Sequence, residues 1–425
     1  FAASHNYQQT QSFLPLNGPY YAPVRYSVGV TMPISSVATS MSSRWWTKLE
    51  DITFLAFLGF VTALQISIAA ANILLSITLL GWAIVMARRA ERPQFPLIFW
   101  PLLAYAATTL ISAAYSLDVT ASLVDSKQLL LFLIVPAVYH IARGQRASTT
   151  ITVIISVGAI SAVIGIFQYG ILEYDNLGRR PQGSLTHYMT YSGLLMLVAC
   201  VAAARILFRR NQRIWPSLIM PTLLVALALT FTRSAWVGAC VALALLLAFK
   251  DFRLMAILPI FAALFFAVAP TSVTNRAYSI LDLKDPTNRD RLAMLRTGAN
   301  IVSDHPWTGV GPDMIKKIYT SYRDPMAVEA INFHLHNVPL QIAAERGLFA
   351  LATWIWFVGI ALIHLVKKLR SSVYPAIAAS GLATIAAMLA AGLFEYNFGD
   401  SEFLMLFLVL VTLPFAADRP EPAST

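Results

Sequence analysis

The feature that most constrains this chain is a series of long apolar runs, which follow one another along most of its length. Only 12% of its 425 residues are charged, which is half of the roughly 25% found in a soluble domain. A run of about 20 apolar residues is long enough to cross a bilayer as a helix. Because the runs are continuous and do not alternate, they exclude an outer-membrane barrel. The sequence therefore predicts an all-α, polytopic membrane protein.

We expect about 12 transmembrane helices, with boundaries good to a few residues. They cover residues 52–69, 70–87, 97–115, 127–142, 150–171, 188–208, 216–232, 234–249, 253–270, 348–366, 373–393 and 401–416. No internal repeat and no Pro- or Gly-rich linker divides the chain.

The net charge of +10 would suit a nucleic-acid partner, but the distribution of the charges does not. With the N-terminus placed inside, the connections on that side hold seventeen basic residues. The short connections on the other side hold four, namely Lys127, Arg179, Arg180 and Arg233. Short cytoplasmic connections carry an excess of Lys and Arg. The pattern therefore predicts cytoplasmic termini, an outside loop, membrane lipids as partners and no nucleic acid.

A long polar segment gives the chain its domain organisation. We expect residues 1–43 to be a disordered tail or a remnant of recombinant expression, since they lack the features of a signal peptide. Residues 44–270 would hold helices 1–9, residues 271–347 a loop domain, and residues 348–425 helices 10–12 with a short cytoplasmic tail. The loop domain is far longer than an ordinary connection. It also gathers arginines and histidines, which favours chemistry at the membrane surface over simple anchoring.

The loop domain is itself predicted to be helical. Asn288 is the expected N-cap of a first helix, which His305 and Pro306 end. The apolar face of this helix consists of Leu292, Leu295, Ala299 and Val302. A second short helix ends near Tyr322, and a third runs from Pro339 toward Gly347. Such helices would rest on the outer membrane surface and cover a cavity.

Three arginines are candidates for binding an anion. Arg233 lies between two apolar runs with almost no loop around it. An arginine at that depth usually faces a cavity, a partner or an anionic ligand, although it can also snorkel to the interface. Arg289 and Arg291 fall in the first turn of the predicted helix, where the helix dipole disfavours cations; pairing with Asp285 or Asp290 is the alternative explanation. Converging guanidinium groups suit a diphosphate.

The segment His334-Leu-His-Asn supplies two histidines and an amide. A histidine is the natural general base near neutral pH, and Asn337 could orient it or bind a substrate hydroxyl. The spacing of His334 and His336 also suits metal binding, but no carboxylate or cysteine set completes a metal site in the sequence, so no metal is expected. A structural histidine pair remains an alternative.

Two further outside connections carry polar side chains. Arg179, Arg180 and His187 lie between the fifth and sixth predicted spans. Glu395 and Asp400 lie between the last two. These two acids could bind substrate, although structural pairing with the arginines is favoured.

Motifs in this region resemble those of the O-antigen ligase and polymerase superfamily. Thr230-Phe-Thr-Arg-Ser-Ala-Trp is similar to the family's Thr-x-Ser-Arg-Gly-Ala span start, with Thr232 and Ser234 as small departures. Arg291-Leu-Ala-Met-Leu followed by Asp304-His-Pro-Trp-Thr-Gly-Val-Gly resembles the family's arginine-containing helix and His-Pro-x-x-Gly-x-Gly turn.

A third motif follows in the same order. His334-Leu-His-Asn, then Leu340 and Ala344-Glu-Arg-Gly, is similar to the family's His-x-His-Asn, Leu and Glu-x-Gly element. The motifs together cover about residues 218–365. The resemblance implies a metal-independent, cofactor-free glycosyltransferase of the integral-membrane C-type class. Its donor would be a glycan on undecaprenyl diphosphate at the periplasmic face of the bacterial inner membrane, and its acceptor lipid A–core.

The resemblance also assigns roles to the candidate residues. His336 would be the base that activates the acceptor hydroxyl, with His334 the less favoured candidate. Arg233 and Arg291 would stabilise the departing diphosphate, and direct attack would invert the anomeric centre. Supporting substrate-binding residues would be Arg179, Arg180, His187, Arg289 and Asn337.

Other functions remain open on the sequence alone. An O-antigen polymerase would use the same donor with a carrier-linked glycan as acceptor, and a protein O-oligosaccharyltransferase is a third possibility within the family. A transporter of lipid-linked glycans belongs to a different class, expected to show repeat symmetry and ionisable residues at mid-span. The predicted spans are nearly free of mid-depth acids and lysines, which favours the transferase.

Overall fold

The computed structural model describes residues 34–89 and 93–420, with side chains from Lys48 onward except those of Arg89 and Arg210. All regular secondary structure among the described residues is helical, without a strand. The chain divides into two compact units, Phe1–Trp45 and Trp46–Thr425, and the second unit contains every site considered below. Most of the expected tail at 1–43 lies outside the described residues, whereas residues 34–43 belong to the first helix.

The α-helices are α1 (Ile34–Ala63), α2 (Ile68–Arg89), α3 (Phe99–Ala114), α4 (Val119–Asp125), α5 (Ile134–Ile141), α6 (Gln145–Gly170), α7 (Tyr188–Phe208), α8 (Ile214–Leu229), α9 (Arg233–Lys250), α10 (Ile257–Val268), α11 (Thr271–Tyr278), α12 (Pro286–Asp304), α13 (Ile315–Tyr322), α14 (Val338–Ser371), α15 (Pro375–Gly392) and α16 (Ser401–Ala417). Short 3-10 segments are η1 (Ser126–Leu133), η2 (Arg210–Gln212), η3 (Phe252–Ala256) and η4 (Asn397–Gly399).

Each of the predicted spans overlaps a helix of the structure. The boundaries agree to within a few residues for most of them, and α7 covers the predicted 188–208. Among the described residues, 7 helices are long and apolar enough to cross a membrane, and four shorter helices are also apolar. The structure therefore supports a helical membrane protein, while the count of twelve spans stays a prediction.

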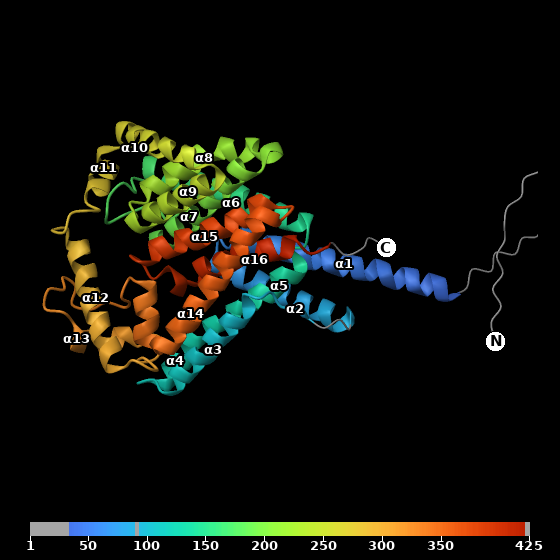
Figure 1. Cartoon of the computed structure of the whole chain (residues 1–425), viewed down its shortest axis with the longest axis horizontal. Helices are drawn as coiled ribbons and strands as arrows, with labels where there is room; N and C mark the ends of the chain where they lie inside the picture. Colours follow the sequence, from blue (N-terminus) through green and yellow to red (C-terminus); the bar gives the residue numbers. More distant parts are fainter. Residues whose placement is uncertain (1–33, 90–92, 421–425) are drawn as a thin grey trace, which may run out of the picture. The chain divides into compact units, whose positions relative to one another are not determined.

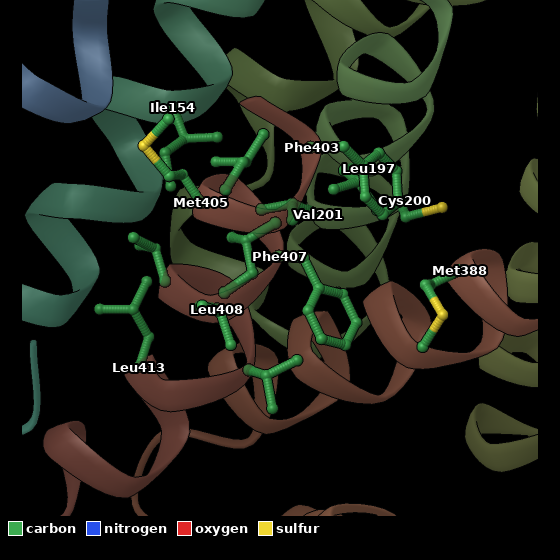
Figure 2. Close-up of a cluster of buried hydrophobic side chains, with 14 of the residues drawn as sticks. Ile154, Leu197, Cys200, Val201, Met388, Phe403, Met405, Phe407, Leu408 and Leu413 are labelled. Carbon is green, nitrogen blue, oxygen red and sulfur yellow. The ribbon is translucent and has the colours of Figure 1, made fainter. Parts of the chain in front are cut away.

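Helix α16 lies at the centre of the apolar core. Its side chains from Phe403 through Ala417 are all buried. Figure 2 shows Phe403, Phe407 and Leu413 of this helix among side chains of α6, α7 and α15. Those neighbours include Ile154, Leu197 and Met388, each completely buried. A helix that is apolar all round is typical of the interior of a large helical bundle.

The helices around α16 pack closely because they carry small residues. Helix α15 reads Pro-Ala-Ile-Ala-Ala-Ser-Gly and continues rich in alanine, and it packs against α7 and α9. Small residues let helix backbones approach one another within a membrane. A Cβ placed on Gly238 of α9, for example, would come within 2.8 Å of the carbonyl oxygen of Ala387. This packing brings the C-terminal end of α15 beside the N-terminal ends of α7 and α9.

The segment between α10 and α14 forms its own small helical layer, with α11, α12 and α13 gathered at the left in Figure 1. Helix α12 begins at Pro286 with Asp285 as its N-cap, and not at Asn288 as predicted, because the Asp285 carboxylate accepts from the Thr287 and Asn288 N–H groups. The helix ends at Asp304, before His305, as predicted.

The predicted apolar face of α12 is not the face that packs within the protein. Leu292 and Leu295 are exposed, and the buried face consists instead of Asp290, Ala293, Met294, Thr297, Gly298 and Ile301. The reason is close packing against α14, since a Cβ on Gly298 would lie 2.5 Å from a methyl group of Leu340. The periodicity of the leucines indicated the large residues as the packed face, whereas the interface with α14 requires small residues such as Ala293 and Gly298.

A kink at Gly347 separates the first turns of α14 from its long apolar part. Gly347 has φ 80°, a left-handed conformation inside the helix. The freed backbone groups are satisfied by the turn after α12, where the Leu348 N–H donates to the Pro306 carbonyl (2.8 Å) and the Gly311 N–H to the Glu345 carbonyl (2.8 Å). The His-Pro turn and the Glu-Arg-Gly element therefore form one structural unit, which fixes the loop layer on α14.

We predict that Gly347→Ala strongly destabilises the protein. Its Cβ would come within 2.0 Å of the Trp307 carbonyl oxygen, and φ is in the region that L side chains rarely adopt. The expected loss is on the order of 3 kcal/mol, seen as a lower thermal midpoint and a lower yield of monodisperse protein in detergent. Gly359→Ala is the matched control, because nothing lies within 4 Å of a Cβ there. Equal midpoints for the two variants would contradict the role of the kink.

Candidate active site

Four connections meet at one end of the helices and bring together most of the polar residues singled out in the sequence. They are the α6–α7 connection, the short α8–α9 turn, the segment between α10 and α14, and the α15–α16 connection. Successive antiparallel helices place these connections at the same end, so residues far apart in the chain become neighbours.

His336 and Glu395 form a close pair in this region. The Nδ1 atom of His336 lies 3.1 Å and 3.0 Å from the two carboxylate oxygens of Glu395, and the side chains are 19% and 13% exposed. Because a carboxylate only accepts, Nδ1–H is the donor. The other ring nitrogen, Nε2, is then the basic one, which is the tautomer that a general base needs.

Local backbone geometry holds His336 in place. The residue has φ 48°, an uncommon left-handed conformation for a residue other than glycine. On one side the Leu335 N–H donates to the Gln341 side chain (2.7 Å). On the other side Asn337 caps α14 by accepting from the Leu340 N–H (2.9 Å) and donates to the Leu393 carbonyl (3.1 Å). Such strain at a turn that its neighbours over-determine is a common feature of active sites.

Glu395 is a residue that the sequence placed nearby without giving it this partner. Burial alone would raise the pKa of its carboxyl, but the charges of His336 and His334 and that of Arg291 hold it at about 2. The carboxylate also accepts from the Tyr396 N–H (3.1 Å). It is therefore ionised at any physiological pH and can stabilise a protonated His336.

A buried charge network adjoins this pair through Tyr396, the residue that follows Glu395. The Arg346 guanidinium donates to Glu345 (2.8 Å) and to the Tyr396 hydroxyl (3.0 Å), and it lies 3.4 Å from Asp125. Since Tyr396 follows Glu395 in the chain, the network fixes the turn that presents Glu395. The arginine of the Glu-Arg-Gly element thus has a structural explanation that the motif alone did not supply.

His334 lies against His336, with ring centroids 4.1 Å apart. Its Nδ1 atom is buried and has no hydrogen-bond partner among the described residues. Burial, followed by the nearby charge of His336, lowers the pKa of His334 to about 4. His334 is therefore neutral at physiological pH and a weak base, and the hydrogen bonds to Glu395 favour His336 for that role.

This pKa predicts a pH dependence of stability. Below pH 6.5 the unfolded chain binds a proton at His334 that the folded protein takes up only near pH 4. Stability is then full above pH 6.5 and falls as the pH is lowered toward 4, by on the order of 3 kcal/mol. We expect His334→Gln to flatten this part of a plot of thermal midpoint against pH. Parallel curves for the wild type and the variant would show that His334 does not cause the pH dependence of stability.

A group of four arginines lies next to the histidine pair. Arg180, Arg233, Arg276 and Arg291 are close enough for their charges to act on one another. Asp285 pairs with two of them, at 3.1 Å from Arg233 and 3.6 Å from Arg276, so the arginine cluster keeps an excess of positive charge. Such an excess in a partly desolvated place is suited to binding a multiply charged anion.

Arg233 is held more tightly than its predicted role requires. Its guanidinium donates to the Ser279 carbonyl (2.7 Å), the Ser279 hydroxyl (2.8 Å) and Asp285 (3.1 Å), and its side chain is 4% exposed. It therefore anchors the 279–285 connection and the start of α12. Its charge contributes to the arginine cluster, but most of its hydrogen bonds are already used within the protein.

Arg291 and Arg276 are the arginines with capacity left for a ligand. Arg291 makes no hydrogen bond or ion pair with a described residue, and burial lowers its pKa. Burial, together with the charges of Arg233 and Arg180, lowers the pKa of Arg276 to about 10, and its buried Nε has no partner within the described part of the chain. The sequence analysis did not single out Arg276, because it lies among other charged residues at the start of the predicted loop domain.

The other predicted site residues are placed differently. Arg180 stacks over the Tyr188 ring (4.3 Å) inside the arginine cluster. Arg179 is exposed over Tyr174 (4.3 Å), and Arg289 is exposed on the outer side of α12. The structure gives these two no neighbour in the arginine cluster, and both ends of the Asn337 amide are already engaged.

A cavity of about 220 Å³ opens beside the histidines. Its lining contains His187, which also caps α7 by accepting from the Met189 N–H (3.3 Å). The residues that line it are His187, Met189, Thr190, His334, Glu395, Tyr396, Asn397, Gly399, Asp400 and Phe403.

The sequence offered no carboxylate to complete a metal site with the two histidines, and the structure corrects this. Ligand atoms of His334, His336 and Glu395 all lie within 4.8 Å of one another. Two histidines and a carboxylate are a donor set that zinc accepts. A chelator control is therefore part of any activity assay of this protein.

Comparison with known proteins supports the motif assignment. Residues 218–355 match a family model described as O-antigen ligase. The matched region runs from α8 into α14 and contains Arg233, Arg276, Arg291, His334 and His336. It does not reach Glu395 or Asp400. No curated protein matches the chain.

Proposed function

We propose that this chain, whose residues 218–355 match the O-antigen ligase family model, belongs to the O-antigen ligase and polymerase superfamily and transfers an O-antigen glycan from undecaprenyl diphosphate to lipid A–core. The observation that carries this proposal is the juxtaposition of a histidine–carboxylate pair and a cluster of arginines. The first can remove a proton from an acceptor, and the second can hold a departing diphosphate.

The proposed transfer requires one general base and a group of cations. The acceptor hydroxyl gives its proton to Nε2 of His336, while Glu395 stabilises the imidazolium that forms. The acceptor oxygen forms a bond to the anomeric carbon, and the bond from that carbon to the diphosphate oxygen breaks. The diphosphate leaves with the electron pair, and Arg291, Arg276 and Arg180 stabilise its charge. Attack from the side opposite the leaving group inverts the anomeric centre.

The distribution of basic residues supports a placement in the bacterial inner membrane. We propose twelve spans, cytoplasmic termini and a periplasmic position for the segment between α10 and α14, because the connections at the opposite end hold most of the short-loop basic residues. The candidate active site then faces the periplasm, where the glycan carrier and lipid A–core would both be present. No nucleotide is required, because the carrier diphosphate is itself the leaving group.

An O-antigen polymerase would share this site and differ only in its acceptor. The test is reconstitution of the purified chain with undecaprenyl-diphosphate glycan and two acceptors, lipid A–core and a carrier-linked glycan, with EDTA and without nucleotide. A glycosylated lipid A–core supports the ligase. Lengthened carrier-linked glycan with unchanged lipid A–core makes it a polymerase, and activity that EDTA abolishes assigns a metal to His334, His336 and Glu395.

A further inference from the structure

The first turns of α14 carry a stripe of polar residues that have no part in the proposed reaction. Asn337, Gln341 and Glu345 recur every four residues, so they lie on one face of the helix. Gln341 is 1% exposed and Glu345 is 2% exposed. Glutamate is almost never fully buried unless it is paired, so the contacts of this face show what it holds in place.

Gln341 connects this face to the turn that carries His336. Its Oε1 accepts from the Leu335 N–H at 2.7 Å, in a buried contact. Its side chain also hydrogen-bonds the Glu345 carboxylate, one helical turn further along. Because Oε1 faces Leu335, the amide NH₂ group is the donor to Glu345. Glu345 therefore fixes the orientation of the Gln341 amide, which then presents an oxygen to the backbone beside His336.

Arg346 connects the same face to the turn that carries Glu395. Its guanidinium donates to the Glu345 carboxylate at 2.8 Å and to the Tyr396 hydroxyl at 3.0 Å. The side chains of Arg346 and Glu345 are 6% and 3% exposed. Buried ion pairs are screened by salt much less than exposed ones. Tyr396 follows Glu395 in the chain, so this ion pair also holds the second member of the histidine–carboxylate pair.

The backbone at Glu345 is itself held by neighbouring elements. The Glu345 carbonyl accepts from the Ser112 hydroxyl of α3 at 2.9 Å and from the Gly311 N–H at 2.8 Å. Arg346 also lies 3.4 Å from Asp125 of α4. Helix α3, helix α4 and the turn after α12 therefore keep the Glu345–Arg346 ion pair in one position, from which both turns of the candidate active site can be held.

We propose that a positioning network on α14 sets the separation of His336 and Glu395. The network consists of three buried residues, Gln341, Glu345 and Arg346. One branch reaches the turn of His336 through the Leu335 N–H, and the other reaches the turn of Glu395 through the Tyr396 hydroxyl. This inference rests on the proposed function, to which it adds the residues that hold the general base and its carboxylate together.

The positioning network should affect the chemical step more than substrate binding. His336 has φ 48°, an uncommon left-handed conformation, and such conformations persist only where the surrounding structure over-determines them. Without the Gln341 contact, the turn can relax and move the imidazole away from Glu395. A small misplacement of a catalytic group caused by a remote change can lower the rate by as much as about 10²-fold.

The test is steady-state kinetics of Gln341→Leu in the reconstituted system. Leucine keeps much of the side-chain volume but cannot accept from the Leu335 N–H. We expect kcat to fall about tenfold, as is typical for the loss of one buried hydrogen bond, while both KM values stay within about twofold. Gln65→Leu is the matched control, because Gln65 is 2% exposed and donates to the Ile154 carbonyl (3.2 Å) of α6. Its kcat should stay within about twofold of the wild type.

The same substitution in the His336→Asn background separates positioning from general structural damage. That background has no imidazole to misplace, so Gln341→Leu should leave the residual rate within about twofold. An equal fold loss in both backgrounds would give Gln341 a structural role only. A kcat of Gln341→Leu equal to that of Gln65→Leu would also overturn the inference.

Tyr396→Phe tests the other branch, and it applies if Gln341→Leu fails to fold. It removes only the oxygen atom that accepts from Arg346. We expect kcat to fall by roughly threefold to tenfold, again without an effect in the His336→Asn background. An unchanged kcat in the folded variant would contradict the proposal.

Thermal midpoints test the positioning network independently of enzymatic activity. Residues in one hydrogen-bond network have non-additive effects on stability. The double variant Gln341→Leu/Tyr396→Phe should therefore lower the midpoint by less than the sum of the two single shifts, whereas additive shifts would contradict a connected network. A wild type that transfers to neither acceptor would refute the proposed function itself, and the midpoints would still decide whether the network is connected.

Discussion

His336→Asn is expected to lower the rate of glycan transfer by 10²–10⁴-fold, the range typical of losing a general base. Asparagine is chosen because it tolerates the left-handed backbone at this position, so the variant isolates the imidazole from the strain. The loss should appear in kcat, while the KM for the carrier-linked donor stays within about twofold, since the arginine cluster is unchanged. The measurement is the initial rate of lipid A–core glycosylation by purified protein.

The matched control is His305→Asn. The ring of this loop histidine lies against Tyr322 and not against His334, Glu395 or the arginine cluster. This variant should retain nearly the full rate. If His336→Asn retained it too, the base would have to be another group. In that case the hydrogen bonds between His336 and Glu395 would be structural, and the mechanism proposed for the acceptor would be wrong.

Arg291→Ala is expected to lower kcat/KM by 10²–10³-fold, comparable to removing one preorganised donor to a developing anion. Arg291 is half-buried within the arginine cluster and makes no hydrogen bond or ion pair with a described residue, so its charge is not used for the fold. Arg291→Lys should recover only part of the loss, because an ammonium group cannot bind a phosphate in a bidentate manner.

Arg289→Ala is the control for this prediction. It removes the same charge two positions earlier on the same helix, from a side chain that is exposed. Its rate should stay within about twofold of the wild type. Equal losses in the two variants would mean that α12 contributes only a general positive potential, and not a specific contact with the diphosphate.

The helices could be predicted from the sequence because bilayer thickness imposes a length on each apolar run. The ends of α7 and α16 followed directly from this rule. The face of α12 did not, since helical periodicity selects large apolar residues, whereas its packing on α14 depends on Gly298. Periodicity describes which side is apolar, and contact with a neighbour decides which side is buried.

The candidate site was predicted in part. His336, Arg291 and Arg180 were identified because histidines and arginines in connections between apolar runs are costly and rarely incidental. The partner of His336 could not be predicted, because Glu395 lies 59 residues away in the chain and meets it only through the packing of α14 and α15. Arg276 could not be distinguished from other loop cations before its burial beside Asp285 was known.

The central claim is that one purified chain transfers the glycan with the carrier diphosphate as leaving group. The most direct test is to measure, in detergent with EDTA and without nucleotide, the undecaprenyl diphosphate released against the lipid A–core glycosylated. Equal molar amounts are predicted, with inversion at the new linkage. Folded protein that releases no undecaprenyl diphosphate, or releases it without glycosylating any acceptor, would contradict the account.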